Sequence, residues 1–275
     1  MKSLHGRSVV ITGASSGIGR AAAIAFAKRG ANLVLAARRV EKLEEVKREV
    51  EALGVKALVV PTDVTDPAQV QRLIDASIEH YGKIDVLINN AGVGMMGAFN
   101  ETPIEEIREV FEVDFFSVVQ MMRAALVAME RDEEGVIVNI ASTAGLMPSP
   151  YISAYNAAKA ALVMLSESVN VEYMGSRIHI VAYCPHITES SFQEAKRTSG
   201  RYRNWIRFGS VVTAEAVAED IVRAVLRPRP LVIHGLLSRV SWKVRALAPW
   251  LYYPVVRRFR DRLREANPIS EDRSS

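Results

Sequence analysis

Short apolar runs rich in β-branched residues alternate with longer amphipathic runs, and this order constrains the fold more than any other feature of the chain. The strand-like runs, in chain order, are SVVIT, NLVLAA, VKALVV, IDVLIN, GVIVNIAS, RIHIVAYCP and PLVIHG. A helix-like run lies between each neighbouring pair. Apolar strands that alternate with helices form a parallel sheet covered on both faces. We therefore predict an α/β fold, a doubly wound (Rossmann) parallel sheet in a single domain, for which 275 residues suffice.

The ends of several predicted helices carry residues that favour a helix start or stop. Gly30 and Gly54 follow the first two amphipathic runs, where glycine ends a helix. Pro67 stands in the first turn of the third run, and Thr213 has the hydroxyl of an N-cap residue for the last one. Residues 107–129 are largely apolar and predict one long helix. Ligands of a doubly wound sheet bind at the carboxyl ends of its strands, so functional residues are expected there.

A glycine-rich turn joins the first predicted strand to the first helix. In VVITGASSGIG, Gly13, Gly17 and Gly19 follow the pattern G-x3-G-x-G. Glycine lets a backbone turn tightly and approach a pyrophosphate, and a helix N-terminus offers N–H groups and a positive dipole to that anion. The alternative is a turn that binds nothing. The position at the first strand-to-helix junction favours a dinucleotide site.

The run YISAYNAAKAAL places Tyr155 and Lys159 four residues apart on a predicted helix. Side chains at this spacing are neighbours on one helix face. A lysine stem that lies along a tyrosine ring is ordinary packing, so the pair alone does not indicate catalysis. Motifs elsewhere in the chain are needed to distinguish ordinary packing of this pair from a catalytic role.

Four motifs occur in chain order at predicted strand ends: TGASSGIG, the NNAG sequence at 89–92, Ser142, and Tyr155 with Lys159. Together they resemble the short-chain dehydrogenase/reductase family, from about residue 8 to about residue 235. The resemblance implies an oxidoreductase that transfers hydride between a nicotinamide dinucleotide and a carbonyl or alcohol carbon. It implies that Tyr155 is the acid/base, that Ser142 binds the substrate oxygen, and that Lys159 holds the nicotinamide ribose.

The proton chemistry of Tyr155 explains why a lysine stands beside it. A free tyrosine has a pKa near ~10, so exchange near neutrality requires a stabilised phenolate. Lys159, together with the positive charge of an oxidised nicotinamide, is the expected source of that stabilisation. We therefore expect the pKa of Tyr155 to be lowered.

The resemblance also implies a set of cofactor contacts spread over the strand ends. These are Gly13, Ser15, Ser16, Gly17, Ile18, Gly19, Arg38, Asp63, Val64, Asn90, Ala91, Gly92, Tyr155, Lys159, Pro185, Ile187 and Ser190. Asp63 and Val64 match the pair that contacts adenine, and residues 90–92 match the contact with the adenosine ribose. For Asp63 a role as a turn residue or N-cap ahead of Pro67 remains an equal alternative.

The end of the second strand bears on the choice of cofactor. An acidic residue there would accept the ribose hydroxyls and favour NAD. The sequence instead has LAARR, with Arg38 and Arg39 at that place. A guanidinium can pair with a 2′-phosphate in a bidentate manner, so we predict NADP(H) over NAD(H). The alternative is that both arginines are solvated at a helix start.

Two positions depart from the family pattern. Asp114 stands where the family has an asparagine that supports a proton relay to the lysine, and aspartate lacks the amide donor. His186 follows Pro185 where the family continues with glycine, and it brings bulk and a titratable ring beside the nicotinamide. Asp114 is still expected to act in the relay, whereas His186 either contacts substrate or fills space.

The residues expected around the substrate are mostly apolar. They are Met95, Met96, Leu146, Met147 and Pro148, with Phe192 and Trp205 from a predicted lid over residues 188–210. Such a pocket suits a hydrophobic ketone or alcohol, although apolar residues are also what any core requires.

The basic charge is concentrated in the C-terminal segment. Residues 239–264 contain eight Lys or Arg residues against one acidic residue, Asp261, whereas the whole chain carries a net charge of +4. The main body therefore has no predicted face for a polyanion, and no nucleic acid partner is expected. We divide the chain into residues 1–235, which bind dinucleotide and carry catalysis, and a basic amphipathic extension over 236–275.

The extension contains aromatic residues among arginines, with an uncharged stretch of 11 residues, 246–256, that is interrupted by proline and too short to span a bilayer. Such a segment lies in a membrane interface or packs on its own or a partner subunit. The single Cys184 excludes an internal disulfide, and the N-terminus has no apolar leader, so a cytoplasmic protein with possible peripheral membrane contact is expected. The family resemblance implies a homo-oligomer, and no motif indicates a metal.

A second class of function is a sensor or scaffold that binds NADP(H) without turnover. The departures at Asp114 and His186 motivate it. The presence of Ser142, Tyr155 and Lys159 together argues against it, because a binding module has no need of a proton donor.

Overall fold

The computed structural model describes residues 1–189, 197–198 and 211–267. Its centre is a seven-stranded parallel sheet with the order β11-β7-β6-β4-β1-β2-β3. The strands are β1 (Ser8–Thr12), β2 (Asn32–Ala37), β3 (Ala57–Pro61), β4 (Val86–Asn89), β6 (Gly135–Ile140), β7 (Ile178–Cys184) and β11 (Leu231–Ile233). They correspond to the strand-like runs in the sequence, and the predicted doubly wound fold is confirmed.

The order of the strands creates a switch point at β1. From there the chain builds outward through β2 and β3 on one side and through β4, β6 and β7 on the other. Connections leave β1 and β4 in opposite directions, so a crevice opens between their carboxyl ends. The glycine-rich turn after β1 and the NNAG sequence after β4 therefore meet at this point.

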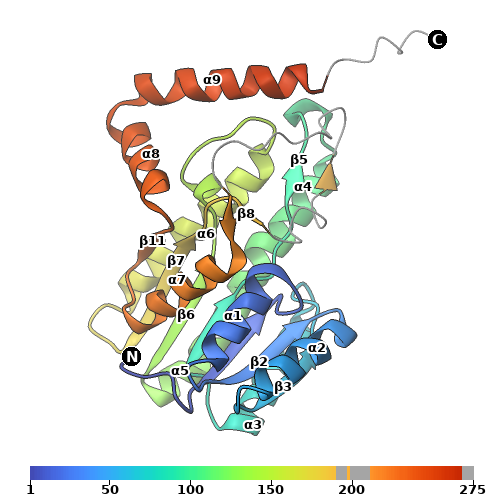
Figure 1. Ribbon diagram of the computed structural model, residues 1–275, viewed down its shortest axis with the longest axis vertical. Helices are drawn as coiled ribbons and strands as arrows, with labels where there is room; N and C mark the ends of the chain where they lie inside the picture. The colour runs from blue at the N-terminus through green and yellow to red at the C-terminus, as the bar shows by residue number, and fades with distance from the viewer. Residues whose placement is uncertain (190–196, 199–210, 268–275) are drawn as a thin grey trace, which may run out of the picture.

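Helices cover both faces of the sheet (Figure 1). Helices α1 (Gly17–Ala27), α2 (Val40–Glu51) and α7 (Ala214–Leu226) bury their apolar side chains in one core, and α3 (Pro67–Tyr81), α5 (Ser117–Asp132) and α6 (Ser153–Glu172) do so in the other. The predicted N-cap of α7 is present, since Thr213 Oγ1 accepts the Ala216 N–H at 3.2 Å. At α3 the N-cap is Asp66, which accepts the N–H groups of Ala68 and Gln69.

The helix predicted over residues 107–129 is not continuous. It consists of α4 (Ile104–Phe111), a π-helical segment (Glu112–Phe116) and α5. Asp114 lies inside the π segment, fully buried, and its Oδ1 accepts the backbone N–H of Val93 at 2.8 Å. Single-turn π segments occur frequently at functional sites. Periodicity did not reveal this one because a widened turn leaves the apolar pattern nearly unchanged.

The C-terminal segment forms α8 (Leu236–Leu247) and α9 (Pro249–Glu265). Figure 1 shows α8 leaving the sheet next to β11 and α9 crossing the end of the molecule above α6 and β5 (Met95–Met96). Phe259 and Leu263 of α9 are buried in a cluster with Met96 and Ala98. Within the described residues, none of the helices is both long and apolar enough to cross a bilayer.

Most of the predicted lid, residues 188–210, lies outside the described residues. Two short pieces are described: β8 (Thr188–Glu189) pairs with β10 (Val212–Thr213), and β9 (Arg197–Thr198) pairs with β5.

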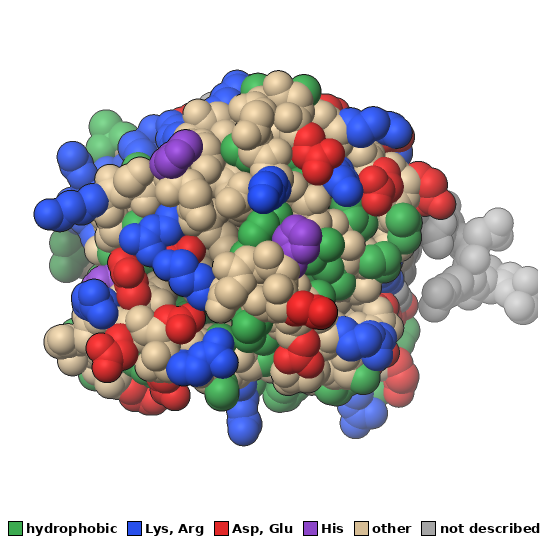
Figure 2. All heavy atoms as spheres, turned by 90° about the horizontal axis from the view of Figure 1, so that it is seen from below, with side chains coloured by type: hydrophobic (Ala, Val, Ile, Leu, Met, Phe, Trp, Pro, Cys, Tyr) green, Lys and Arg blue, Asp and Glu red, His purple; other side chains and the backbone are tan. Residues whose placement is uncertain are grey.

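The face of the molecule remote from α9 carries charges of both signs. Figure 2 shows Lys and Arg side chains interspersed with Asp and Glu over this face.

Candidate active site

A cavity of about 1120 Å³ lies at the carboxyl ends of the strands. Its walls come from the turns after β1, β2, β3, β4, β6 and β7, from α6, and from α8 and α9. Among the described residues, every residue predicted to bind cofactor lines the cavity except Gly19. Gly19 packs closely against the Gly13 carbonyl inside the turn. Ser190 lies outside the described residues.

The glycine-rich turn is shaped by backbone conformations and contacts that only glycine permits. Gly13 has φ +65°, and a Cβ on Gly19 would stand 2.2 Å from the Gly13 carbonyl oxygen. Ser16 at the N-cap of α1 makes no capping hydrogen bond; its hydroxyl accepts from Arg39 Nη2 at 3.0 Å instead. The first N–H groups of α1 therefore face the cavity without a side-chain cap, which fits the phosphate of a dinucleotide.

Side chains from β2 and β3 form the far end of the cavity. Ala37 ends β2 without a carboxylate, and Arg38 beside it is 77% exposed, with Nη1 4.0 Å from Asp63 Oδ2. Asp63 accepts the backbone N–H of Thr65 at 3.0 Å and the Thr65 hydroxyl at 2.8 Å. These hydrogen bonds, with Arg38 nearby, lower the pKa of Asp63. The turn role weighed for Asp63 is thus present, whereas the N-cap role belongs to Asp66.

Asn90 ties the turn after β4 to the turn after β1. Its Nδ2 donates to the carbonyl of Thr12 at 3.0 Å and to that of Gly13 at 3.3 Å. The backbone N–H groups of Asn90 and Ala91 both donate to Thr12 Oγ1. The two turns that enclose the switch-point crevice are consequently held as one rigid unit.

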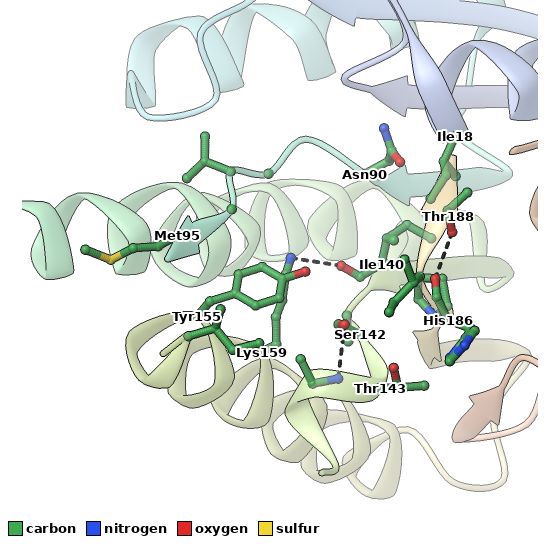
Figure 3. A pocket seen from close by; sticks show the side chains of 18 of the residues that line it. Ile18, Asn90, Met95, Ile140, Ser142, Thr143, Tyr155, Lys159, His186 and Thr188 are labelled. Carbon is green, nitrogen blue, oxygen red and sulfur yellow. Dashed lines mark hydrogen bonds between the residues drawn. The ribbon is translucent and has the colours of Figure 1, made fainter. Parts of the chain in front are cut away.

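Ser142, Tyr155 and Lys159 converge on the cavity from two elements (Figure 3). Ser142 caps the short 3-10 helix after β6, where its Oγ accepts the Ala144 N–H at 3.1 Å, and it is hydrogen-bonded to the Tyr155 hydroxyl. Tyr155 and Lys159 are neighbours on α6, with Lys159 Nζ 5.8 Å from the centre of the tyrosine ring. The spacing seen in the sequence thus becomes a cluster of a hydroxyl, a phenol and an ammonium.

The ammonium of Lys159 is buried and held from two sides. Its Nζ donates to the Ile140 carbonyl at 3.1 Å and lies 3.6 Å from Asp114 Oδ2. Burial raises the pKa of Asp114, while Lys159 and the Val93 N–H act against that rise. A Cβ on Gly92 would stand 3.0 Å from Asp114 Oδ1, so the glycine of NNAG makes room for this carboxylate.

Burial raises the pKa of Tyr155 above its ordinary value. The negative charge of Asp114 raises this pKa further, and the hydrogen bond from Ser142 opposes the rise. The expected lowering by Lys159 is therefore not what the structure shows. The reason is that desolvation disfavours the phenolate more than the hydrogen bond favours it. A protonated phenol at neutral pH is suited to donate a proton to a developing alkoxide.

His186 connects the end of β7 to the C-terminal helices. Its Nδ1 is hydrogen-bonded to Ser238 Oγ of α8 at 3.2 Å, and its carbonyl accepts the Thr188 hydroxyl at 2.8 Å. Pro185 lies beside it, and the Pro185 carbonyl accepts the Thr143 N–H at 3.1 Å. The histidine that replaces the family's glycine thus has a structural partner in the extension.

The apolar residues predicted around the substrate divide into two groups. Met95 and Met147 line the cavity. Met96 and Leu146 do not, because both are buried in the cores, and Pro148 contributes a carbonyl that accepts the Tyr252 hydroxyl at 3.0 Å. Phe192 and Trp205 lie outside the described residues.

One wall of the cavity is not predicted from the sequence. It comes from the two C-terminal helices and consists of Leu237, Ser238, Val240, Ser241, Val244, Leu251, Tyr252, Val255, Val256 and Phe259. A signal for it exists in α9, where Tyr252, Val256, Phe259 and Leu263 follow each other at spacings of four, three and four. That spacing is typical of one buried helix face, and the surrounding arginines obscured it.

Comparisons with known proteins agree with this geometry. A family model described as short chain dehydrogenase matches residues 7–200. The 11-beta-hydroxysteroid dehydrogenase 1A of Arabidopsis thaliana is 36% identical over 261 residues, covering 91% of this chain and 74% of that protein. Ketoacyl reductase HetN of a Nostoc species is 33% identical over 226 residues, covering 82% of this chain and 77% of that protein.

A solved short chain dehydrogenase/reductase from Burkholderia phymatum, in complex with NAD, superposes with a TM-score of 0.82. It is 30% identical, and the match covers 91% of this chain and 96% of that one. The parallel sheet, its glycine-rich turn and the cluster after β6 define a dinucleotide-binding oxidoreductase. The chain belongs to the short-chain dehydrogenase/reductase family, whose members use a nicotinamide cofactor on hydroxyl or keto groups.

The replacement of Asp114 by alanine is expected to lower the free energy of unfolding by about 3 kcal/mol, since it leaves the buried ammonium of Lys159 without its counter-charge. Asp114→Asn keeps an acceptor for the Val93 N–H and is expected to lose less. Urea unfolding at fixed pH measures both. The control is Asp75→Ala at an exposed position of α3, and equal stability of Asp114→Ala and this control would contradict the prediction.

Proposed function

We propose that the protein is an NADP(H)-dependent oxidoreductase of a hydrophobic carbonyl/alcohol pair, with Tyr155 as its proton donor and acceptor. The observation that carries the proposal is the convergence of Ser142, Tyr155 and Lys159 in the same cavity as the glycine-rich turn. A cavity that only bound dinucleotide would not require a phenol and a hydroxyl joined by a hydrogen bond.

The roles follow from the contacts. Tyr155 is a neutral phenol at neutral pH, and burial keeps its pKa above the ordinary value, so it can give its proton to the substrate oxygen during reduction. Ser142, which donates its hydroxyl hydrogen to the phenol in the structure, donates it instead to the substrate oxygen once substrate is bound and holds that oxygen near Tyr155. Lys159 binds the nicotinamide ribose. Asp114 holds the Lys159 side chain in position, with its Oδ2 3.6 Å from Nζ.

The dinucleotide fits the residues that line the strand ends. The cradle around Gly13, the uncapped N-terminus of α1 and the rigid pair of turns joined by Asn90 suit its pyrophosphate and adenosine ribose. Val64 lines the same end of the cavity beside Asp63. When bound, the nicotinamide supplies or accepts the hydride.

The preference for NADP(H) rests on charge at the end of β2. Ala37 offers no carboxylate to ribose hydroxyls, and Arg38 is exposed at the cavity rim. Arg39 adds a second guanidinium, bonded to Ser15 and Ser16 of the glycine-rich turn. Two cations with no strand-end acid favour a 2′-phosphate.

The substrate class follows from the apolar walls. Met95, Met147 and the apolar side chains of α8 and α9 line the same cavity. Such walls select bulky apolar molecules. Relatives bear the names hydroxysteroid dehydrogenase and ketoacyl reductase, so steroid and acyl ketones are the first compounds to test.

The remaining parts of the proposal concern location and assembly. A corner between α8 and α9 exposes Leu247, Trp250 and Tyr253, at 77%, 69% and 52%, with Arg257 and Arg258 nearby in the sequence. Exposed apolar side chains beside arginines suit peripheral contact with an anionic membrane surface of the cytoplasm. Apolar side chains also stay exposed on α5 and α6, including Val127 and Met164, and they suit a homo-oligomer interface.

The alternative, a sensor or scaffold that binds NADP(H) without turnover, has less support. Its motivation was the pair of departures at Asp114 and His186. Both side chains have contacts that a catalytic site accommodates, Asp114 with Lys159 and His186 with Ser238.

Tyr155→Phe is expected to reduce NADPH-dependent ketone reduction by about 10²–10⁴-fold, because it removes only the proton donor. Steady-state NADPH oxidation over a ketone panel measures this, and NADPH fluorescence checks that binding is retained. Tyr253→Phe, at an exposed tyrosine, is the matched control. Undiminished activity of Tyr155→Phe contradicts the assignment, and tight NADPH binding with no turnover in the wild type supports the sensor.

Arg38→Asp is expected to weaken NADPH binding by about tenfold or more while it leaves NADH binding unchanged or improved, because it replaces a phosphate partner by a like charge. Titration of both cofactors measures the ratio. Arg131→Asp on α5 controls for the change in net charge. An unchanged NADPH/NADH ratio removes Arg38 from the cofactor site.

Leu247→Ser with Trp250→Ser is expected to reduce partitioning onto anionic vesicles by about tenfold, because two large apolar side chains no longer enter the interface. Co-sedimentation of the full chain with such vesicles measures it. Val127→Ser with Met164→Ser removes equally exposed apolar groups elsewhere. Equal binding of the wild type and the first double variant would exclude membrane contact through this corner.

A further inference from the structure

Side chains of α8 and α9 form hydrogen bonds with the loop that follows Ser142. Three side chains reach it: Arg245 donates to the Leu146 carbonyl at 2.5 Å, Tyr252 to the Pro148 carbonyl at 3.0 Å, and Arg264 to the Tyr151 hydroxyl at 2.9 Å. One comes from α8 and two come from α9, and their partners lie in order along the loop, at residues 146, 148 and 151. The loop lies directly between Ser142 and the start of α6, which bears Tyr155. The position of α8 and α9 is therefore fixed relative to the reacting groups.

The backbone of this loop supports the same conclusion. Tyr151 has φ +63°, a conformation that costs a non-glycine residue free energy unless its surroundings enforce it. Its carbonyl accepts the Gly97 N–H at 2.8 Å, and its ring packs on the cluster of Phe259 and Leu263. Residues of α9 thus help to hold the strained end of the loop.

The base of α8 is fixed at the opposite side of the cavity. Ser238 is 3% exposed and bonded to His186 Nδ1, which follows the Pro185 of the cofactor end. Val244 of α8, together with Val256 and Phe259 of α9, lines the cavity. Val244 and Val256 are half-buried and Phe259 is buried, so these side chains form an inner wall rather than an outer rim.

We infer that α8 and α9 are part of the substrate site, and that Val244, Val256 and Phe259 set the size and apolar character of the substrate. Leu237, Val240, Leu251 and Val255 also line the cavity but are exposed, so they stand at its mouth. The wall contains no charged side chain. It selects a ketone or alcohol whose apolar body extends away from Tyr155 and fills the space under the helices.

This inference rests on the proposed carbonyl/alcohol activity. The test compares Val256→Trp and Val244→Trp with Leu236→Trp, which adds the same indole at a position of α8 that is 74% exposed and does not line the cavity. Substrates are a series of ketones of increasing size: cyclohexanone, a decalone and a tetracyclic ketosteroid. Measured quantities are kcat/KM with NADPH and, by calorimetry, binding of the tetracyclic ketone to the NADPH-loaded protein.

The wall variants are expected to lose about tenfold or more in kcat/KM and in affinity for the tetracyclic ketone, with less than about threefold loss for cyclohexanone. NADPH affinity and the Leu236→Trp kinetics stay at wild-type values. Tyr252→Phe, which removes one hydrogen bond to the loop without filling the cavity, is expected to raise KM for the large ketone and leave NADPH affinity unchanged.

The outcomes separate the inference from the activity. If the wild type binds the large ketone without turnover, and the Val256→Trp variant no longer binds it, the proposed function fails and the inference stands. If the wild type turns over the series and the wall variants lose equally for every size, or lose nothing, the inference is overturned. A wild type that neither binds nor reduces any member overturns both.

Discussion

The site depends on the contacts that hold the buried ammonium of Lys159. A charge removed from water needs a counter-charge and hydrogen-bond acceptors, and here they come from Asp114 and the Ile140 carbonyl. These partners belong to the π segment and to the end of β6, so three elements must stay in register to satisfy one side chain. The same requirement brings Tyr155, one turn away on α6, to the end of the strand where Ser142 follows.

The two departures from the family pattern have physical counterparts. Asp114 lies in the π-helical turn, accepts the Val93 N–H and faces Lys159. The carboxylate that stands in place of the family's asparagine amide is therefore paired with an ammonium. Its charge also raises the pKa of Tyr155. His186 stands where the family has glycine, and its ring forms a hydrogen bond with Ser238 of α8. Each departure is thus tied to another element.

The C-terminal helices change what the fold offers to a ligand. A doubly wound sheet leaves the carboxyl ends of its strands open, and loops usually close them. Here α8 and α9 cross that end, bury Phe259 and Leu263 against Met96, and complete a cavity of about 1120 Å³. Residues of opposite character share these helices, since apolar side chains line the cavity while most of the arginines are exposed and Arg245 donates to the Leu146 carbonyl.

The parallel sheet, its strand runs, the glycine-rich turn and the set of Ser142, Tyr155 and Lys159 could all be predicted from the sequence alone. Apolar periodicity and glycine are local signals, and the strand ends of a doubly wound sheet bring the motifs together. Three features follow from the three-dimensional packing alone: the break at Glu112–Phe116, the raised pKa of Tyr155, and the cavity wall formed by α8 and α9. A π turn hardly alters an apolar pattern, a pKa depends on burial by distant segments, and an arginine-rich helix does not reveal what its apolar face covers. These properties arise from contacts between residues far apart in the chain, which local patterns do not encode.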